Sequence, residues 1–285
     1  MKVHLNKKIN IEKRKSALKK TYLYSEITEI VKPEDVSLSS FKLKNDLNPY
    51  FWHDGKLDLY ARKNLLMIAR DLIEGTEFED MEVEDIIMTG SLANYNWNEK
   101  HSDIDLHVVL NFNEIADDTE LVKKFFDVFK KSWNQKHEGL KIYGYPVEVY
   151  FQDKNEKHTS SGVYSVLFDK WLIEPDRDNM STDNLDDSYI KEKAAEFMSK
   201  IDDLRNELDD LLKKGVQDYN MYMDIYERAD TILEDIKATR KESLSADGAK
   251  EMTEGNIVFK SLRRENYIEK LFNIKIESYD AANSL

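Results

Sequence analysis

The sequence of 285 residues contains no cysteine and only nine glycines and four prolines. Without cysteine, disulfide frameworks, zinc sites built on thiolates and thiol nucleophiles are all excluded. No run of about 18 apolar residues is present, which excludes a transmembrane helix. The first residues also lack the apolar core of about 7–15 residues that a signal peptide needs. We therefore expect a cytoplasmic protein with no membrane partner.

The charged residues are numerous and unevenly distributed. Asp and Glu number 56 against 42 Lys and Arg, so the formal net charge at pH 7 is −14. Residues 1–20 reverse this balance with eight basic side chains and one acidic side chain. Because an acidic body repels a long polyanion, long duplex DNA is a disfavoured partner. The basic arm either steers a nucleic acid such as RNA or forms a solvated helix face.

The middle of the chain alternates helix and strand patterns. Apolar residues recur at spacings of three and four over 59–73 and 121–133, which predicts two amphipathic helices. Short apolar or alternating runs over 86–89, 101–109 and 147–151 predict three strands. We therefore expect an α/β (α+β) fold with a small mixed sheet.

The C-terminal part is expected to be helical throughout. Over 190–211 the apolar residues follow a seven-residue repeat, which ends before Gly215. A second pattern of threes and fours covers 219–236, so these two helices predict an antiparallel hairpin. A final helix is expected over 257–272. The predicted organisation is a basic N-terminal arm at 1–40, a mixed core at 41–180 and a helical domain at 181–285.

Three acidic residues lie on predicted strands close to a Gly-Ser pair. Gly90 and Ser91 follow the first strand, and Asp103 and Asp105 share one face of the second strand, about 7 Å apart. Glu148 lies between apolar neighbours on the third strand. Two carboxylates this close repel each other and are stable mainly around cations, and oxygen-only ligands suit Mg²⁺. A third acid on a neighbouring strand can supply what a second metal ion needs.

This arrangement resembles the DNA polymerase β-like nucleotidyltransferase superfamily. Its signature is an apolar strand, Gly-Ser, a short gap and then Asp-apolar-Asp on a second strand. Here the signature reads IIMTGS at 86–91 and SDIDL at 102–106. Glu148 matches the third acidic position, where members of the superfamily often have Asp. The resemblance implies a small mixed-sheet nucleotidyltransferase core, followed by a helical domain that closes over the cleft.

The resemblance also implies a reaction and a set of site residues. A nucleoside monophosphate would move from an NTP, with ATP expected, to a hydroxyl of a small molecule, a protein or an RNA end such as that of a tRNA. Asp103, Asp105 and Glu148 would be the catalytic residues and would ligate two Mg²⁺ ions, with Mn²⁺ as an alternative. Gly90 and Ser91 would hold the triphosphate.

Other segments resemble predicted nucleotidyltransferases encoded by tailed bacteriophages. These segments read LNP at 47–49, YS at 164–165, KWL at 170–172 and FKSLRR at 259–264. In the last of them Lys260, Arg263 and Arg264 are candidate nucleotide-binding residues that would reach the triphosphate from the helical domain. The alternative is that they are solvated helix charges.

Several residues keep a second interpretation. Asp153 is an alternative third acid. His101 and His107 flank the two aspartates on the same strand face, which would suit a transition-metal site shared with them. Tyr164 either stacks on a base or lies in the core.

Three functions stay open from the sequence. The first is a Mg²⁺-dependent nucleotidyltransferase that modifies an acceptor. The second is an enzyme of the same superfamily that makes nucleotide signals, and the third is a non-catalytic binding module resembling an antitoxin. The three acids together with Gly90 and Ser91 favour catalysis. The sequence has neither a phosphate-binding loop of the Gly-Lys-Ser/Thr type nor a serine hydrolase elbow.

Overall fold

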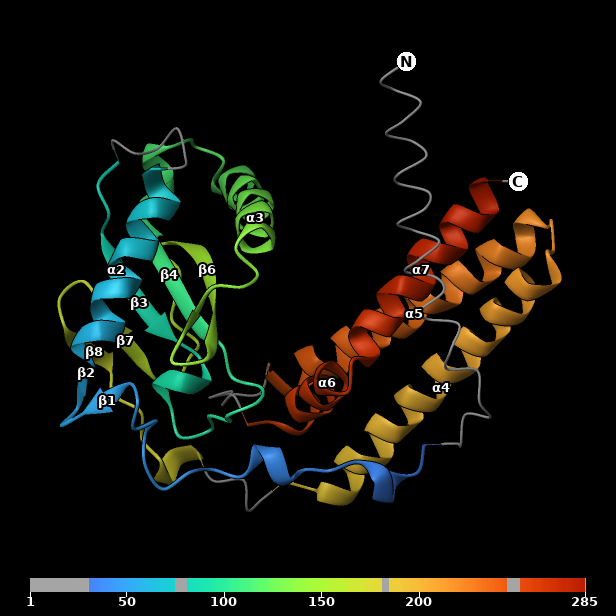
Figure 1. The fold of residues 1–285 in the computed structure, drawn as a ribbon, viewed down its shortest axis with the longest axis horizontal. Coiled ribbons are helices and arrows are strands. Elements are labelled where there is room, and N and C mark those ends of the chain that lie inside the picture. Colours follow the sequence, from blue (N-terminus) through green and yellow to red (C-terminus); the bar gives the residue numbers. More distant parts are fainter. Residues whose placement is uncertain (1–30, 75–80, 181–184, 245–251, 285) are drawn as a thin grey trace.

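The computed structural model describes residues 31–74, 81–180, 185–244 and 252–284. The N-terminal arm is predicted over 1–40, and its eight basic residues within 1–20 are outside the described part of the chain. Within it, apolar side chains gather in two large clusters. One cluster contains the sheet with two helices, and the other contains the helices of the C-terminal part (Figure 1).

A six-stranded mixed sheet forms the centre of the first cluster. Its strand order is β5-β6-β4-β3-β7-β8, in which β4 and β6 are parallel and all other neighbours are antiparallel. This confirms the predicted fold class. The strands are β3 (Asp85–Thr89), β4 (Ile104–Leu110), β5 (Lys141–Ile142), β6 (Tyr145–Asp153), β7 (Val163–Ser165) and β8 (Lys170–Ile173), with a separate hairpin of β1 (Trp52–His53) and β2 (Lys56–Leu57).

Two helices pack on the apolar side of this sheet. The buried faces of α2 (Leu59–Glu74) and α3 (Thr119–Lys136) share one cluster with the inward side chains of β4, such as Leu106. Because successive side chains of a strand alternate between its two faces, Asp105 lies on the opposite side. The second face of β4 therefore carries Asp105 and His107, followed by Val109 in a small apolar cluster with Ile87 and Val163.

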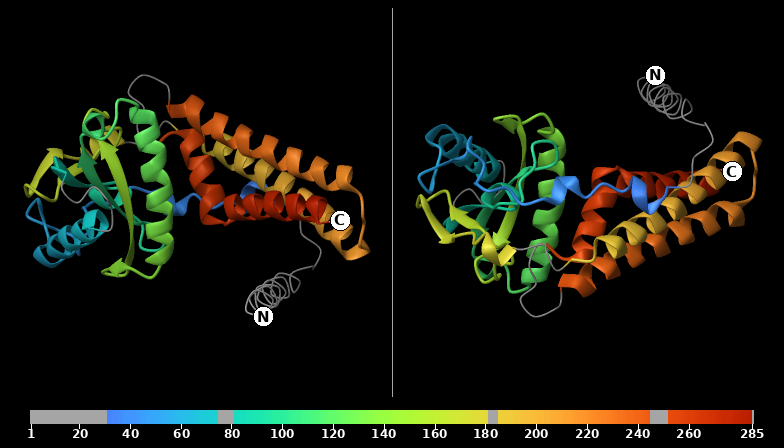
Figure 2. Two further views of the ribbon diagram at one scale, coloured as in Figure 1. Left: turned by 90° about the horizontal axis from the view of Figure 1, so that it is seen from above. Right: turned by 90° about the horizontal axis from the view of Figure 1, so that it is seen from below.

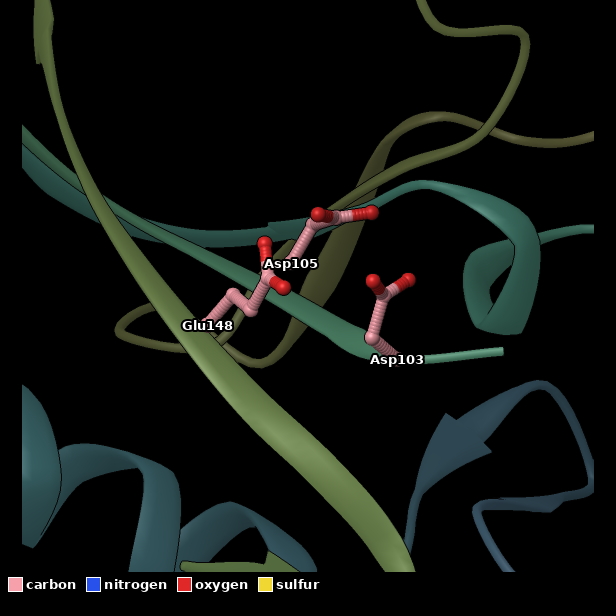
Figure 3. A group of neighbouring side chains, drawn as sticks. All are labelled: Asp103, Asp105 and Glu148. Carbon is pink, nitrogen blue, oxygen red and sulfur yellow. The ribbon is translucent and has the colours of Figure 1, made fainter. Parts of the chain in front are cut away.

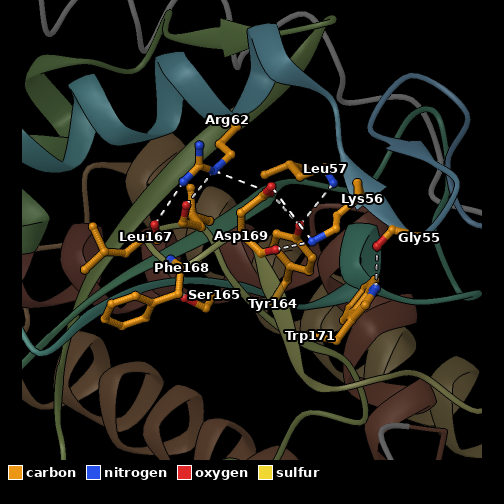
Figure 4. A network of polar contacts seen from close by, with 11 residues as sticks. Gly55, Lys56, Leu57, Arg62, Tyr164, Ser165, Leu167, Phe168, Asp169 and Trp171 are labelled. Carbon is orange, nitrogen blue, oxygen red and sulfur yellow. Dashed lines mark hydrogen bonds and ion pairs between the residues drawn. The ribbon is translucent and has the colours of Figure 1, made fainter.

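A polar network holds the β7–β8 hairpin against β1, β2 and α2 (Figure 4). Asp169, in the turn of this hairpin, accepts a hydrogen bond of 2.7 Å from the Tyr164 hydroxyl and lies 3.4 Å from Nε of Arg62. Tyr164 is fully buried, and its ring contacts Trp52 and Trp171 edge to face. The core interpretation of Tyr164 is therefore confirmed, and the interpretation as a base-stacking residue is wrong.

The described C-terminal residues form four helices (Figure 2). The predicted hairpin consists of α4 (Asp187–Lys214) and α5 (Tyr219–Leu244), and α6 (Glu254–Arg264) and α7 (Tyr267–Asn283) follow it. Gly215, with φ +63°, ends α4 in the left-handed conformation that glycine adopts readily. The long helices α4, α5 and α7 lie side by side, and α6 lies at the end of the bundle nearest the sheet.

The predicted single helix over 257–272 is wrong. The first helix ends at Arg264 and the second begins at Tyr267. Between them Asn266 has φ +61°, in the left-handed region that Asn tolerates better than most residues. The turn sets α6 across the end of the bundle instead of in line with α7 (Figure 2).

The segment before the sheet packs on the helical part. Val36 and Phe41 are buried in the helical cluster, as is Met180. Residues at both ends of the predicted 41–180 core therefore pack with the helices, and the division into three units stays a prediction. The short 3₁₀ helices of the described chain are Pro33–Asp35, Ser39–Phe41, Ser91–Ala93, Phe112–Glu114 and Asp178–Met180.

None of the helices in the described ranges combines the length and the apolar character that a membrane crossing requires.

Candidate functional site

Three carboxylates converge on the polar face of the sheet (Figure 3). Asp103 immediately precedes β4, Asp105 lies in β4, and Glu148 lies in β6. One carboxylate oxygen of each residue lies within 4.8 Å of the other two, and all three residues are partly buried. The structure therefore brings together the three acids that the sequence reasoning put forward as catalytic residues and metal ligands.

Strand pairing produces this convergence. In the parallel pairing of β4 with β6, Asp105 lies opposite Glu148, and in the antiparallel pairing of β4 with β3 it lies opposite Thr89. Thr89 is the last residue of β3, so Gly90 and Ser91 begin the next loop beside the acids. The Gly-Ser pair and the three acids thus occupy one place in the fold.

Gly90 allows the loop to pass close to the acids. Its backbone angles, φ +75° and ψ −161°, belong to a region that is almost restricted to glycine. A Cβ atom at this position would overlap with Oδ2 of Asp105. Ser91 Oγ lies 2.7 Å from Ser102 Oγ, which also accepts a hydrogen bond of 2.8 Å from the Asn98 amide. These bonds tie together the two ends of the loop between β3 and β4.

The charges of the site are only partly balanced. Burial raises the pKa of Asp103, and the neighbouring Glu148 carboxylate raises it further. Arg263 opposes this rise from α6, with Nη2 4.0 Å from Asp103 Oδ2, and the charge of Lys260 acts in the same direction. The Arg263 side chain is 52% exposed, so water screens its charge. Three partly buried carboxylates with incomplete compensation are a donor set that suits a hard divalent cation.

Tyr150 supports Glu148 from the same strand. Its hydroxyl donates a hydrogen bond of 2.6 Å to Glu148 Oε2, and burial raises the pKa of Tyr150, so the phenol keeps its proton. The ring stacks on His107 with centroids 4.8 Å apart, and Nζ of Lys130 lies 4.4 Å from its centroid. The sequence reasoning missed Tyr150, although the period of two places it on the same face as Glu148.

The alternative ligands lie elsewhere. Burial lowers the pKa of His107 to about 4, and its Nε2 hydrogen-bonds Thr89 Oγ1 at 3.2 Å. Asp153 lies opposite Leu110 at the other end of β6. Within the described ranges, the only side chains close enough to share one ion are the three acids, so the transition-metal site with His101 and His107 is wrong.

The basic residues of α6 divide into two groups. The charges of Arg263 and Lys260 oppose the rise in the pKa of Asp103. Arg264 instead lies over the ring of Phe41, with its guanidinium carbon 3.9 Å from the ring centroid. Of the three residues suggested for the triphosphate, Arg263 therefore lies beside Asp103 and Lys260 acts on Asp103 through its charge, whereas Arg264 packs on Phe41.

The matched segment of the chain contains this site. Residues 70–172 match the family described as a nucleotidyltransferase domain. The matched segment includes Gly90, Ser91 and all three acids, and it ends before α4. The match supports the superfamily that the motif resembles, and with it a transferase role in nucleotidyl transfer. Comparison with curated proteins and with solved structures found no match. The resemblance to phage-encoded proteins stays a prediction.

Proposed function

We propose that this protein is a divalent-metal-dependent nucleotidyltransferase. It moves a nucleoside monophosphate from an NTP, with ATP as the expected donor, to a hydroxyl of an acceptor. The observation that carries the proposal is the convergence of Asp103, Asp105 and Glu148 within 4.8 Å beside the Gly90-Ser91 loop. The acceptor is a small molecule, a protein or an RNA end, and the cytoplasmic location stays an expectation.

The three acids are the residues that would hold the metal. Their oxygen donors suit Mg²⁺ or Mn²⁺, and the family typically uses divalent ions, of which we propose two. When bound, such ions neutralise phosphate charge and lower the pKa of the attacking hydroxyl. The raised pKa of Asp103, caused by burial and by the neighbouring Glu148 carboxylate, means that a nearby cation would stabilise the ionised carboxylates.

The remaining steps belong to residues of the chain. Glu148 accepts the proton of the acceptor hydroxyl, whose oxygen forms a bond to the α-phosphorus of the NTP. The bond from that phosphorus to the oxygen that bridges it to the β-phosphorus breaks, and pyrophosphate leaves. Ser91 and the backbone at Gly90 hold the triphosphate, and Lys260 and Arg263 offset its negative charge. Positioning and charge neutralisation therefore do most of the catalysis.

The test follows the label of a radioactive nucleotide. The full chain is incubated with each NTP labelled at the α-phosphate, with Mg²⁺ or Mn²⁺ and cell extract, and in parallel with γ-labelled ATP. Nucleotidyl transfer places the α-label on an acceptor and the γ-label in pyrophosphate. Transfer of the γ-label to the acceptor would indicate a kinase and would contradict the proposal.

Two variants make this experiment specific. Asp105→Asn removes one acid of the site and is expected to abolish transfer. Asp153→Asn is the matched control, because it removes an acid from the other end of the paired strands, outside the site. An equal loss of nucleotidyl transfer in Asp105→Asn and Asp153→Asn would argue against the assigned site. Transfer among NTPs without extract would instead favour nucleotide-signal synthesis, and metal-dependent NTP binding without transfer would favour a non-catalytic module.

A further inference from the structure

A cavity of about 530 Å³ lies between the segment 31–41, the loop at 98–101 and the helices α4 and α6, and the α6–α7 turn also lines it. Its size is that of a pocket for a small molecule. Two of the residues that line the cavity are close in sequence to the acidic site. His101 lies two residues before Asp103, and Arg264 follows Arg263, which contacts Asp103. The residues that line the cavity include Phe41, Ser261, Arg264, Asp35 and Glu265.

Arg264 contributes a positive charge to this cavity and is less exposed than Lys100, which also lines the cavity. It is half-buried over Phe41 and donates one hydrogen bond, of 2.6 Å, to Ser40 Oγ. Burial and the charge of Arg263 lower the pKa of Arg264 to about 10. In the described part of the chain, no carboxylate lies within ion-pair distance of its guanidinium. The guanidinium of Arg264 carries five N–H donors and lines the cavity, and one hydrogen bond, to Ser40, is formed within the described residues.

The acidic side chains of the cavity do not neutralise this charge. Asp35 is exposed and accepts a hydrogen bond of 2.9 Å from the Lys32 amide, and Glu265 is exposed at the start of the α6–α7 turn. Neither acid is among the groups that shift the pKa of Arg264, and because both are exposed, water screens their charges from an anion bound at the guanidinium.

A second polar group of the cavity, the hydroxyl of Ser261, has no hydrogen-bond partner among the described residues. Ser261 is 4% exposed. Ser261 precedes Arg264 by three residues on α6, so the two side chains lie on the same side of the helix. A buried hydroxyl without a partner costs free energy, which a ligand that accepts its hydrogen bond would recover.

We propose that this cavity binds the acceptor, and that the acceptor is a small molecule with an anionic group, a phosphate or a carboxylate, held by Arg264 and Ser261. A guanidinium binds both groups through paired hydrogen bonds. The role as acceptor rests on the proposed function, whereas anion binding does not. The hydroxyl of the bound molecule would face Asp103, on the side where Arg263 holds the nucleotide.

The experiment measures anion binding without metal or nucleotide. The full chain in EDTA at fixed ionic strength is titrated with inorganic phosphate and, separately, with malonate, by calorimetry or by NMR. The wild-type chain is expected to bind at least one probe, and the tighter probe identifies the anionic group. Arg264→Gln should weaken binding by about tenfold or more. Arg228→Gln, which alters a cation of α5 that is paired with Glu207 and Asp224 outside the cavity, should leave anion binding unchanged.

Ser261→Ala separates binding from folding. Removing a buried hydroxyl without a partner should keep or raise the melting temperature while weakening anion binding severalfold. The proposal is overturned if the wild-type chain binds neither probe at tens of millimolar, if Arg264→Gln binds as tightly as the wild type, or if Arg228→Gln loses as much affinity as Arg264→Gln. A Ser261→Ala variant with lower melting temperature and unchanged binding would also overturn it.

The two proposals can fail separately. Anion binding at Arg264 without transfer of an α-label would remove the proposed function and leave an anion site. Transfer of the label with no anion binding would keep the proposed function and overturn the acceptor cavity.

Discussion

Asp105 and Glu148 lie directly opposite each other on two parallel strands, β4 and β6, although they are far apart in the sequence. Their positions are fixed by register, because a shift of one residue would turn Glu148 to the apolar face of the sheet. The buried Val147 and Val149 on either side of Glu148 prevent such a shift, since they would then face the polar side. The packing of the core therefore determines where the third acid lies.

Glu148 is expected to be required for binding of divalent ions. Glu148→Gln keeps the shape of the side chain and removes its charge, so the affinity for Mn²⁺ should fall on the order of tenfold or more. Electron paramagnetic resonance of bound Mn²⁺ measures this change. Asp153→Asn on the same strand is the control and should bind Mn²⁺ like the wild type. Equal affinities in the wild type and Glu148→Gln would remove Glu148 from the metal site.

Asp103→Asn is expected to stabilise the metal-free protein at neutral pH. The folded state raises the pKa of Asp103, through burial and through Glu148, so the ionised carboxylate costs stability above that pKa. The cost is lost as the pH falls through the raised pKa, because the native carboxyl then carries a proton. The gain from Asn should therefore be largest near pH 7 and should shrink in acid.

Thermal melting in EDTA at a series of pH values measures this gain. Each kcal/mol of relieved repulsion should raise the melting temperature by about 2–4 °C in a chain of this size. Asp203→Asn, at an exposed position of α4, should show no such trend. With added Mg²⁺ the wild type should have the higher melting temperature, because the ion stabilises the wild type more than Asp103→Asn. A lower melting temperature for Asp103→Asn at pH 7 would mark Asp103 as a structural acid.

Gly90→Ala is expected to abolish activity by displacing Asp105. The added methyl group overlaps with Asp105 Oδ2, and a displacement of about 1 Å can cost on the order of 100-fold in rate. Gly144→Ala is the matched control, because Gly144 also has a positive φ, +87°, with open space around its Cβ position. Both variants should lose stability from backbone strain. Only Gly90→Ala should also lose Mn²⁺ binding, and similar activity in the two variants would contradict the steric argument.

Tyr150→Phe is expected to lower kcat by about tenfold, with little change in KM for the NTP. The variant keeps the ring contacts with His107 and removes the hydroxyl that holds Glu148. Steady-state kinetics separate the two constants. Tyr143→Phe removes a hydroxyl bonded to Asp58, outside the acidic site, and should leave kcat unchanged. In a double variant with Glu148→Gln, the effect of Tyr150→Phe should disappear, whereas additive losses would mean that Tyr150 acts independently of Glu148.

Local patterns in the sequence were sufficient for the acids and for three of the strands, β3, β4 and β6, whereas the strands β1, β2, β5, β7 and β8 were not predicted. The period of two put Asp103 and Asp105 on one face, and apolar neighbours marked Glu148 as a strand residue, so one register brings the three together. The seven-residue repeat likewise identified α4, and Gly215 its end. These features depend on residues that are close together in the chain.

Other features depend on single torsions and on distant packing. The apolar pattern continues through 257–272, so only the left-handed torsion of Asn266 separates α6 from α7. The sequence carries no signal that Phe41, far away along the chain, packs under Arg264. The sequence could therefore not predict that Arg263 lies near Asp103 while Arg264 packs on Phe41.

Arg263 is expected to contribute to nucleotide affinity. Its guanidinium lies 4.0 Å from Asp103 Oδ2, so a triphosphate bound beside the acids would lie within its field. Because the side chain is half-exposed and water screens it, Arg263→Gln should weaken binding of Mg·ATP by only about twofold to fivefold. The loss should shrink at high salt. Arg264→Gln, which alters the neighbouring cation on the cavity side, is the control and should bind Mg·ATP like the wild type. Calorimetric titration at two salt concentrations measures these affinities, and a larger loss in Arg264→Gln than in Arg263→Gln would place the triphosphate in the cavity instead of beside the acids.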